Sequence, residues 1–509
     1  MPDVEQFDAI IVGAGQAGVP LARGLAEAGW KTALVERKHI GGSCVNEGCT
    51  PTKTMAASAR VAYLARRAAD YGVQLGSVTV DMPTVRRRKR DMVELWRTGA
   101  ERRLRETPGL SLIFGEARFI GRRGLGAEGQ RSGEQDAGGP DTGADLANMH
   151  HTGAHSTGVY HADTHRLLVR TEAGQEQFLE APRVFLDTGA RPSIPNIAGL
   201  GSVPYLDSTG IMELDEVPDH LLVLGAGYVA VEFAQMFRRF GSRVTIIHRG
   251  GRVLSREDPD VAGALTEVLR EDGIDMLLHS QVEEVGGRSA RSALAGGITV
   301  RLRSSATSKV IEGSHLLVAT GRRPNTEDLD LAAVGVQTDD YGYITVDERL
   351  ESSTSGIWAL GDIKGGPAFT HISYDDYRIV KTNLLGSGGA SLVDRVVPYT
   401  IFTDPQLGRV GLSETEARAK GYDVEVATLP MGRVARALQT AESRGFIKAV
   451  TEKQTGRILG AAVLGVDGGE LMAVIEVAML GGVTAQILHN ATFAHPTLAE
   501  ALNNLFAAG

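Results

Sequence analysis

The chain is 509 residues long, which exceeds one ordinary hydrophobic core and predicts three or four domains. Its formal net charge of −9 argues against nucleic acid or an anionic membrane as a main partner. The first residues lack a basic targeting region, and no apolar segment is long enough to span a bilayer. We therefore expect a cytoplasmic protein.

The first predicted element is a buried parallel strand at residues 7–12, which runs into a glycine-rich turn at residues 13–18. A helix-forming stretch follows, and a second strand at residues 32–35 ends at Glu36, which is placed to bind ribose hydroxyls. This order of elements is the fingerprint of a dinucleotide site. Three glycines make the turn, let a diphosphate approach the helix N-terminus and allow helix–strand packing: Gly13, Gly15 and Gly18.

The only two cysteines, Cys44 and Cys49, follow in a glycine-rich stretch. A disulfide that closes so small a ring stabilises the fold little, which disfavours a structural pair. A metal site is also disfavoured, because no second cysteine pair exists. If a helix begins near Pro51, the Lys53 ammonium and the Cys49 thiol share a face at its N-terminus. The helix N-terminus and the ammonium both lower the pKa of the Cys49 thiol. We interpret the pair as a redox-active dithiol.

Residues 61–105 are predicted to be largely helical, and residues 112–119 form a strand. A basic run at residues 86–90 is interpreted as a solvated helix face and not as a nucleic-acid patch. Residues 121–158 lack periodicity and predict an inserted loop. Histidines crowd the far end of this insertion, and the surface-loop interpretation is favoured over transition-metal capture by them: His150, His151, His155, His161 and His165.

A second fingerprint begins with a strand at residues 221–224 and continues through a glycine turn, a helix at 231–237 and a strand at 244–247. This internal repeat implies a second dinucleotide. The turn contains Gly225, Gly227, Tyr228 and Ala230.

The two copies differ where the second strand ends. His248 holds the position that Glu36 holds in the first copy, and three arginines follow it: Arg249, Arg252 and Arg256. Basic residues there fit the 2′-phosphate of NADPH, whereas an acid would favour NADH. We expect NADPH, with NADH possible if these arginines only occupy an exposed loop.

Later segments add further candidates. Residues 316–325 echo residues 184–192, and a strand at 357–360 ends in Gly361 and Asp362, an acid of the kind that binds a ribityl chain or phosphate. From about residue 396, strands alternate with helices, including one at 469–480.

A histidine and an acid close the chain. His495 and Glu500 stand five residues apart, across a proline turn at Pro496 that could start a helix. The carboxylate could then hold one imidazole nitrogen and leave the other free for general acid–base work. An ordinary structural histidine is the equally weighted alternative.

Together these motifs resemble the class I flavoprotein disulfide reductases, the pyridine nucleotide-disulfide oxidoreductase family. The likeness is greatest to its mercuric-reductase-like and reactive-chlorine-resistance branch. It covers nearly the whole chain outside the 121–165 insertion and rests on six motifs: Gly13 to Gly18, Cys44 to Lys53, Gly225 to Glu232, Ala319 to Arg322, Gly361-Asp362, and His495 to Glu500.

The resemblance implies an α/β fold with two Rossmann-like dinucleotide-binding domains and a C-terminal α+β dimerisation domain. The expected divisions are an FAD-binding domain at 1–205 with its insertion at about 121–165, an NAD(P)H-binding domain at 206–324, a central domain at 325–395 that completes the FAD site, and a dimerisation domain at 396–509.

The resemblance also implies an NAD(P)H-dependent flavoprotein enzyme, with FAD in the first site and NADPH in the second. Hydride would pass from NADPH to the flavin and on to the disulfide, with Cys49 as the flavin-facing thiolate and Cys44 as the interchange thiol. Lys53 would pair with Glu232 beside the flavin. Other residues assigned to the cofactors are Gly42, Ser43, Ala117, Thr188, Gly189, Gly321, Gly361, Asp362, Thr370 at the flavin edge, and Tyr228 over the nicotinamide pocket.

By the same resemblance, His495 and Glu500 come from the partner subunit of a homodimer. Mercuric reductases carry a C-terminal cysteine pair that the tail at 503–509 lacks, which disfavours efficient mercury reduction. Glu47, between the thiols, adds negative charge that opposes thiolate formation and anionic substrates.

The expected acceptor is a disulfide, a metal ion (mercuric or cupric) or a quinone-like molecule. Alternatives are a lipoamide dehydrogenase-like activity, or a redox-sensing or metal-binding flavoprotein with little turnover that uses the histidine-rich insertion for recognition.

Overall fold

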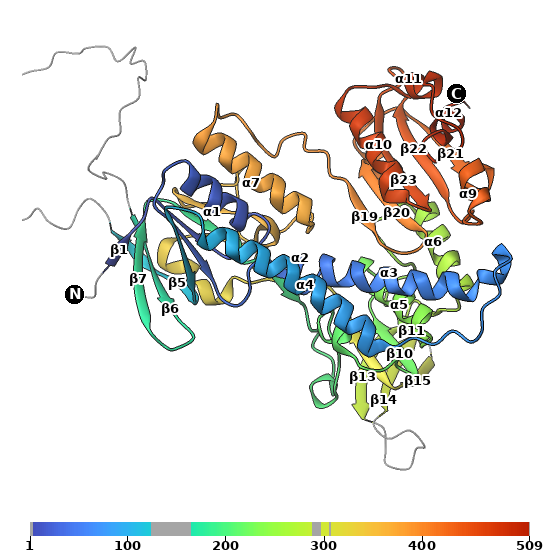
Figure 1. The fold of residues 1–509 in the computed structure, drawn as a ribbon, viewed down its shortest axis with the longest axis horizontal. Helices are drawn as coiled ribbons and strands as arrows, with labels where there is room; N and C mark the ends of the chain where they lie inside the picture. The colour runs from blue at the N-terminus through green and yellow to red at the C-terminus, as the bar shows by residue number, and fades with distance from the viewer. Residues whose placement is uncertain (1–3, 124–163, 288–296, 305–306, 508–509) are drawn as a thin grey trace, which may run out of the picture.

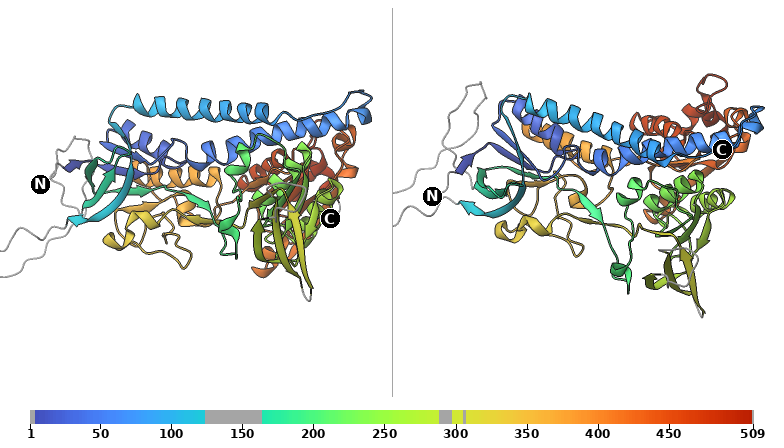
Figure 2. Two further views of the ribbon diagram at one scale, coloured as in Figure 1. Left: turned by 90° about the horizontal axis from the view of Figure 1, so that it is seen from below. Right: turned by 60° about the horizontal axis from the view of Figure 1, so that its bottom comes forward.

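The computed structural model describes residues 4–123, 164–287, 297–304 and 307–507. Four of the histidines in the predicted insertion lie outside these residues: His150, His151, His155 and His161. Figure 1 shows one group of elements around α1 and α7, a second around α5 and β10, and a third that contains the C-terminal sheet. The long helices α3 and α4 connect the first group to the other two, as all three views show (Figures 1 and 2).

The first group contains a five-stranded parallel sheet in the order β18-β8-β2-β3-β4. Its strands are short apolar runs with few exposed residues, as expected for strands covered on both faces. The helices α1 (Gly18–Glu27) and α7 (Thr370–Leu385) lie side by side against it. The strands are β2 (Ala9–Val12), β3 (Thr32–Glu36), β4 (Leu110–Phe114), β8 (Val184–Leu186) and β18 (Ile357–Ala359).

A second sheet of the first group has the order β1-β7-β6-β5. The single strand predicted at 112–119 is therefore wrong, because Gly115 divides it between two sheets. A Cβ at Gly115 would lie 2.7 Å from Val169, so only glycine fits this crossing. The strands are β1 (Val4–Gln6), β5 (Glu116–Arg123), β6 (Thr164–Arg170) and β7 (Glu176–Ala181).

The predicted insertion is too long at both ends. Arg122 of β5 pairs with His165 of β6, so residues 121–123 and 164–165 belong to an antiparallel ladder. Ladder hydrogen bonds and burial of alternate side chains hold these residues in the sheet.

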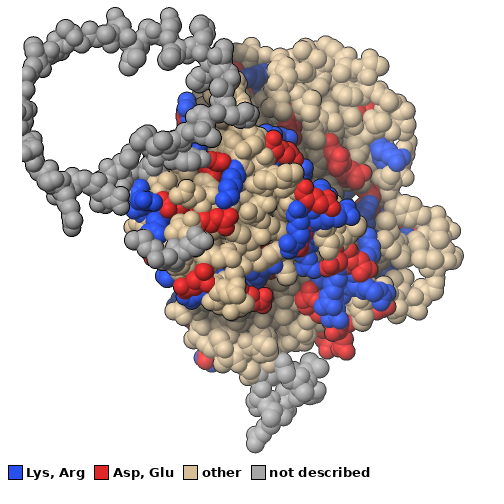
Figure 3. All heavy atoms as spheres, turned by 60° about the vertical axis from the view of Figure 1, so that its left-hand side comes forward, with Lys and Arg blue, Asp and Glu red and all other residues tan. Residues whose placement is uncertain are grey.

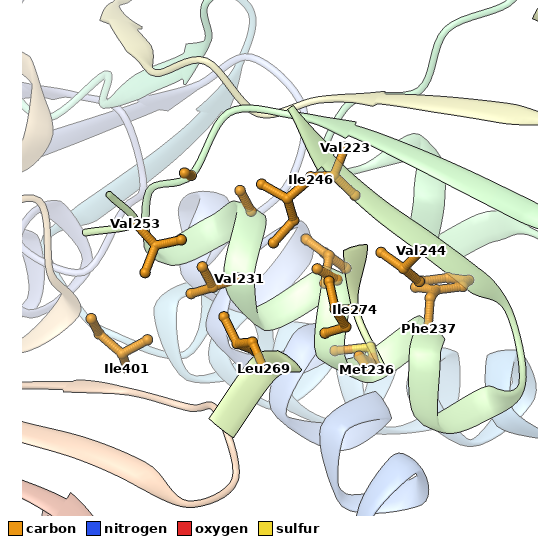
Figure 4. Close-up of a cluster of buried hydrophobic side chains, with 14 of the residues drawn as sticks. Val223, Val231, Met236, Phe237, Val244, Ile246, Val253, Leu269, Ile274 and Ile401 are labelled. Atoms are coloured by element: carbon orange, nitrogen blue, oxygen red, sulfur yellow. The ribbon is translucent and has the colours of Figure 1, made fainter. Parts of the chain in front are cut away.

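The second group has a parallel sheet in the order β12-β11-β10-β16, with a three-stranded antiparallel sheet, β13-β14-β15, beside it. Figure 4 shows apolar side chains of α5, among them Val231 and Phe237, close to Ile246 of β11. Burial of this face fixes α5 on the sheet. The elements are β10 (His220–Leu224), α5 (Tyr228–Phe240), β11 (Arg243–Ile247), α6 (Pro259–Glu271), β12 (Asp275–Leu277), β13 (Gln281–Gly287), β14 (Ile298–Ser304), β15 (Thr307–Gly313) and β16 (His315–Val318).

The two echoing segments of the sequence pair with each other. Strand β9 (Ala190–Pro192) lies antiparallel to β17 (Arg322–Pro324), and this two-stranded ribbon joins the first and second groups. Short 3₁₀ turns occur at η1 (Ala68–Tyr71), η2 (Leu200–Ser202), η3 (Gly210–Glu213), η4 (Glu327–Leu329), η5 (Leu331–Val334), η6 (Gly361–Lys364) and η7 (Met431–Arg433).

The third group is an antiparallel sheet in the order β19-β20-β23-β22-β21, with α10 packed on it. The predicted helix at 469–480 is confirmed as α10 (Gly468–Leu480). The remaining elements are β19 (Tyr399–Ile401), β20 (Gln406–Gly411), α8 (Glu414–Ala419), β21 (Val424–Pro430), α9 (Ala435–Gln439), β22 (Phe446–Glu452), β23 (Ile458–Gly465), α11 (Ala485–Asn490) and α12 (Ala501–Leu505).

The predicted helical region at 61–105 is confirmed as the end of α3 (Cys49–Arg66) and α4 (Met82–Arg105), with η1 and a segment without regular secondary structure between them. The basic run on α4 is not simply a solvated face. Lys89 is buried and pairs with Glu213 of η3, which also binds Arg90. The run therefore fastens α4 to the second group.

The predicted α/β fold class is confirmed by the two parallel sheets and the separate C-terminal sheet. On the face drawn in Figure 3, basic and acidic side chains are interspersed. Within the described part of the chain, no helix combines the length and apolarity needed to cross a membrane.

Candidate active site

A cavity of about 2060 Å³ contains both thiols and is lined by residues of all three groups. Its walls include the first glycine turn, α2 (Gly42–Asn46), the start of α3 and the start of α7. Predicted site residues that line it include Gly13, Gly15, Glu36, Gly42, Ser43, Ala117, Thr188, Gly189, Tyr228, Asp362 and Thr370. A cavity of this size accommodates extended ligands.

The first glycine turn fits an FAD diphosphate. Gly13 has φ +102°, and a Cβ there would lie 2.3 Å from the carbonyl oxygen of Asp187. A Cβ at Gly42 would lie 2.8 Å from the Cα of Gly15, so this contact also requires glycine. Glu36 ends β3 and accepts the N–H of Ala14 at 2.9 Å. The acid therefore lies beside the turn, as the fingerprint predicts.

Asp362 lies in η6 at the end of β18, as predicted, and burial raises the pKa of its carboxyl above the ordinary range. The Arg322 guanidinium lies 3.8 Å from it. Thr188 donates its hydroxyl to the carbonyl of Asn325, which joins the segment after β8 to the residue that follows β17.

The two cysteines are free thiols at the adjoining ends of two helices. Cys44 lies in α2 and Cys49 is the first residue of α3, two residues before the predicted start near Pro51. The Thr370 hydroxyl donates to Cys44 Sγ at 2.9 Å and lies 3.3 Å from Cys49 Sγ. Thr370 thus touches both sulfur atoms from the N-terminus of α7.

The surroundings separate the two thiols electrostatically. The Cys44 thiol lowers the pKa of Cys49 to about 6, and the Thr370 hydroxyl and Lys53 ammonium add to this against the opposing effect of burial. Hydrogen bonding to Cys49, together with burial, raises the pKa of Cys44 well above its ordinary value. Cys49 is therefore the thiolate of the pair near neutral pH.

Lys53 and Glu232 connect α3 to α5. Lys53 Nζ lies 2.9 Å from Glu232 Oε2 and 4.6 Å from the ring centroid of Phe402. Glu232 Oε1 also accepts the N–H of Phe402, just beyond β19, at 2.8 Å. Burial alone would lower the pKa of Lys53, but the Glu232 carboxylate raises it overall, so the side chain stays cationic beside Cys49.

The second glycine turn repeats the first. Gly225 has φ +118°, and a Cβ there would lie 2.2 Å from the carbonyl oxygen of Ala319. Tyr228 begins α5 and lines the cavity, with its ring 6.0 Å from that of Phe369. Gly227 and Ala230 flank Tyr228 at the start of α5, and Gly321 adopts φ +132° before β17.

The loop after β11 carries the predicted 2′-phosphate residues. Arg249 and Arg256 are exposed, and Arg252 donates to the carbonyl of Ser255 at 2.9 Å. Burial, followed by the charge of Arg249, lowers the pKa of His248. The preference for NADPH stays a prediction.

His495 and Glu500 lie together but apart from the thiols. His495 Nδ1 is 2.9 Å and 3.0 Å from the two Glu500 carboxylate oxygens, and the imidazole is 66% exposed. The helix expected after Pro496 begins only at Ala501, because residues 495–500 form bends and turns. Neither His495 nor Glu500 is among the described residues that line the thiol cavity.

One of the five histidines of the predicted cluster, His165, does not lie in a surface loop. His165 lies in β6, is 1% exposed, and its Nε2 lies 3.1 Å from the carbonyl oxygen of Ser355. Its placement in a surface loop is therefore wrong. Among the residues that the structure describes, no group of three or more His, Cys, Asp or Glu side chains is arranged to hold a metal ion.

Sequence reasoning missed Asp187 and Phe402. Phe402 contributes a backbone N–H and a ring face, for which a sequence carries no signal. Asp187 could have been found from the sequence. Residues 184–192 resemble residues 316–325, and Asp187 is a charged residue at the position that Ala319 holds in the second segment. Its carboxylate accepts the N–H of Gly18 at 2.7 Å, inside the first glycine turn.

Comparison with known proteins gives consistent matches. The pyridine nucleotide-disulphide oxidoreductase model matches residues 7–376, and the dimerisation domain of that family matches residues 397–506. The chain is 35% identical to the probable pyridine nucleotide-disulfide oxidoreductase RclA of Escherichia coli, over 99% of each chain. It is 32% identical to a mercuric reductase of Staphylococcus aureus, over 97% of this chain and 81% of that one.

Solved structures agree with these matches. The Cu(II) complex of the flavoprotein disulfide reductase RclA from Escherichia coli has a TM-score of 0.81 and 34% identity, over 99% of each chain. LpdA from Mycobacterium tuberculosis has a TM-score of 0.81 and 26% identity, also over 99% of each chain.

Proposed function

Because the chain belongs to the pyridine nucleotide-disulphide oxidoreductase family, we propose that it is a cytoplasmic, NADPH-dependent reductase that sends electrons through Cys44 and Cys49 to an external acceptor. The family resemblance, the fold class, the assignment as an enzyme, and FAD and NAD(P)H as cofactors are confirmed by the matches. The preference for NADPH, the electron path and the acceptor are the proposal.

The observation that carries the proposal is the unequal thiol pair. Cys49 is poised as a thiolate, while Cys44 keeps its proton, and both contact Thr370. A structural pair gains nothing from such a difference. A redox pair needs one stabilised thiolate and one sulfur left for exchange.

When bound, NADPH supplies a hydride and FAD supplies the two-electron carrier between the nicotinamide and sulfur. The residues of this chain prepare the sulfur side of that exchange. Lys53 keeps positive charge beside Cys49, Glu232 holds the Lys53 ammonium in place, and the Thr370 hydroxyl orients both sulfurs. Tyr228 and the second glycine turn would hold the nicotinamide nucleotide.

The outward step balances for each acceptor class. Reformation of the Cys44–Cys49 S–S bond releases two electrons and the one thiol proton that Cys44 carries, since Cys49 is already a thiolate. A disulfide takes both electrons as its own S–S bond breaks, and the two thiols formed take the Cys44 proton and one proton from solvent. A mercuric ion takes both electrons, whereas two cupric ions take one electron each.

The names of the relatives favour a metal ion as the electron acceptor. Several are mercuric reductases, and RclA forms a Cu(II) complex. The sequence contains no cysteine besides Cys44 and Cys49 that could pass mercury to this pair, so we favour the cupric ion. A disulfide acceptor of the lipoamide class is the second candidate, because the His495–Glu500 pair is suited to protonating a leaving thiolate.

We also propose that the active site is shared across a homodimer. The dimerisation-domain match supports the dimer. His495 is exposed and hydrogen-bonded to Glu500, and it is not among the described lining of the thiol cavity of its own chain. A partner subunit could therefore receive this imidazole near its Cys44.

The test is turnover of the holoenzyme with NADPH and separate acceptors: Cu(II), Hg(II), lipoamide, glutathione disulfide and a quinone. Cys49→Ser is expected to lower thiol-dependent turnover on the order of 10³-fold or more. Ser58→Ala on the same helix is the matched control and should leave the rate unchanged. Full turnover in Cys49→Ser with every acceptor would refute the dithiol path, and slow turnover of the wild type with all acceptors would favour a sensing role.

A further inference from the structure

The two glycine turns are closed by different residues. In each unit the first glycine packs on the carbonyl of the residue just after the neighbouring strand, which is Asp187 after β8 and Ala319 after β16. The corresponding Cβ distances are 2.3 Å at Gly13 and 2.2 Å at Gly225, so Asp187 and Ala319 hold equivalent positions. A carboxylate therefore stands in the first site where the second has a methyl group.

The Asp187 carboxylate occupies the interior of the FAD turn. Its Oδ2 accepts the N–H of Gly18, the first residue of α1, at 2.7 Å. A Cβ at Gly15 would lie 2.6 Å from Oδ2, and one at Gly361 would lie 2.8 Å from Oδ1. The side chain is thus surrounded by the glycines assigned to the diphosphate, and Asp187 is only 7% exposed.

The charges that face Asp187 are mostly negative. Burial is the main cause that raises the pKa of Asp187, and Asp362 of η6 and Asp376 of α7 raise it further. On the far side of the turn, the Glu36 carboxylate accepts the Ala14 N–H. The nearby cations are engaged elsewhere: Lys364 and Arg395 pair with Asp376, and Arg322 lies beside Asp362.

Among the described residues, no lysine or arginine forms an ion pair with Asp187. An anionic Asp187 and an anionic diphosphate would therefore compete for the same partial positive charge at the start of α1. Two like charges in so enclosed a site cannot both be stabilised without a counter-ion.

We propose that Asp187 is an affinity-determining residue of the FAD site that must hold a proton when the cofactor is bound. Wherever the pH leaves Asp187 ionised before FAD arrives, binding of FAD consumes one proton from solution, which converts the carboxylate to the acid, with no other bond made or broken. FAD affinity consequently falls as pH rises above the pKa of Asp187 in the empty protein.

The direct test uses wild-type protein stripped of FAD. Mixing it with FAD in weakly buffered solutions of increasing pH should take up protons in an amount that rises toward about one per FAD bound. Flavin fluorescence titrations between pH 6 and 9 should show a dissociation constant that rises by up to about tenfold per pH unit. FAD bound without proton uptake at any pH, and with a dissociation constant that does not change with pH, would overturn the role of Asp187, whereas no FAD binding at all would instead overturn the assignment of the first turn.

Asp187→Asn separates charge from packing. The amide keeps an oxygen for the Gly18 N–H, so FAD affinity should become nearly independent of pH and exceed that of the wild type at pH 8.5. Affinity for 2′,5′-ADP, which occupies only the second turn, should match the wild type at each pH. A wild-type pH slope in Asp187→Asn would overturn the proposal. If this variant does not fold, Asp187→Ala, which copies Ala319, provides the same comparison.

Discussion

The two dinucleotide units share a backbone turn and differ in the charge placed around it. Gly13 and Gly225 have similar positive φ angles and meet equivalent carbonyl groups. Around the first turn the neighbouring side chains are acids, including Glu36 and Asp187, whereas arginines follow β11 of the second unit. We therefore expect the backbone to select dinucleotides as a class, and the side chains to select which dinucleotide is bound.

The largest effect that tests this comparison is loss of either glycine. Gly13→Ala places a methyl group 2.3 Å from a backbone oxygen at φ +102°, and should cost more than about 2 kcal/mol of stability and remove FAD. Gly225→Ala should retain FAD and lose NADPH binding. FAD content by absorbance and thermal unfolding measure the first outcome, and a binding titration with NADPH measures the second.

Gly29→Ala is the matched control for the glycine variants. Gly29 has φ +89°, but a methyl group added there would meet no atom within 4 Å, so this variant bears backbone strain without a clash. Equal loss of FAD in Gly29→Ala and Gly13→Ala would show that the close approach to Asp187 does not matter.

A smaller effect concerns the basic loop. Arg249→Ala should raise the KM for NADPH by about 10- to 100-fold, since a hydrogen bond to a charged group contributes about 1.5–3 kcal/mol. The KM for NADH should stay nearly constant, because NADH lacks the 2′-phosphate. Arg243→Ala, at the other end of β11, is the control. An equal rise for both nucleotides would remove Arg249 from 2′-phosphate recognition.

The smallest effect concerns the ion pair that joins the two units. With the pKa of Cys49 at about 6, the thiolate persists above that pH and is lost as pH falls through it. Lys53→Met removes the stabilising cation and should raise the pKa of Cys49 by about 1 unit. The measurement is the pH midpoint of the long-wavelength absorbance of the NADPH-reduced holoenzyme, with Lys420→Met as an exposed control.

Local sequence signals predicted the two turns and the cysteine helix. Glycines at fixed offsets after apolar runs define the turns, and the four-residue spacing of Cys49 and Lys53 places both on one helix face. Boundaries that depend on tertiary context were less accurate. Gly115 sends one apolar stretch into two sheets, and the helix expected at Pro496 begins only at Ala501.

Contacts between distant segments were not predictable from local pattern. Thr370 meets the two thiols from more than 300 residues away, and Lys89 finds Glu213 only because α4 packs on η3. The sequence shows that a threonine and a basic run exist, but the fold decides what they touch.

The contact between Glu232 and Phe402 has a consequence for engineering. The carboxylate that holds Lys53 beside Cys49 is itself held by a backbone N–H just beyond the first strand of the C-terminal sheet. The C-terminal sheet therefore cannot be exchanged for that of another protein without an effect on the thiol site. A chimera that exchanged residues 396–509 for those of a relative would alter the nucleophilicity of a cysteine some 350 positions earlier in the chain, unless the segment around residue 402 were transplanted with its backbone geometry intact.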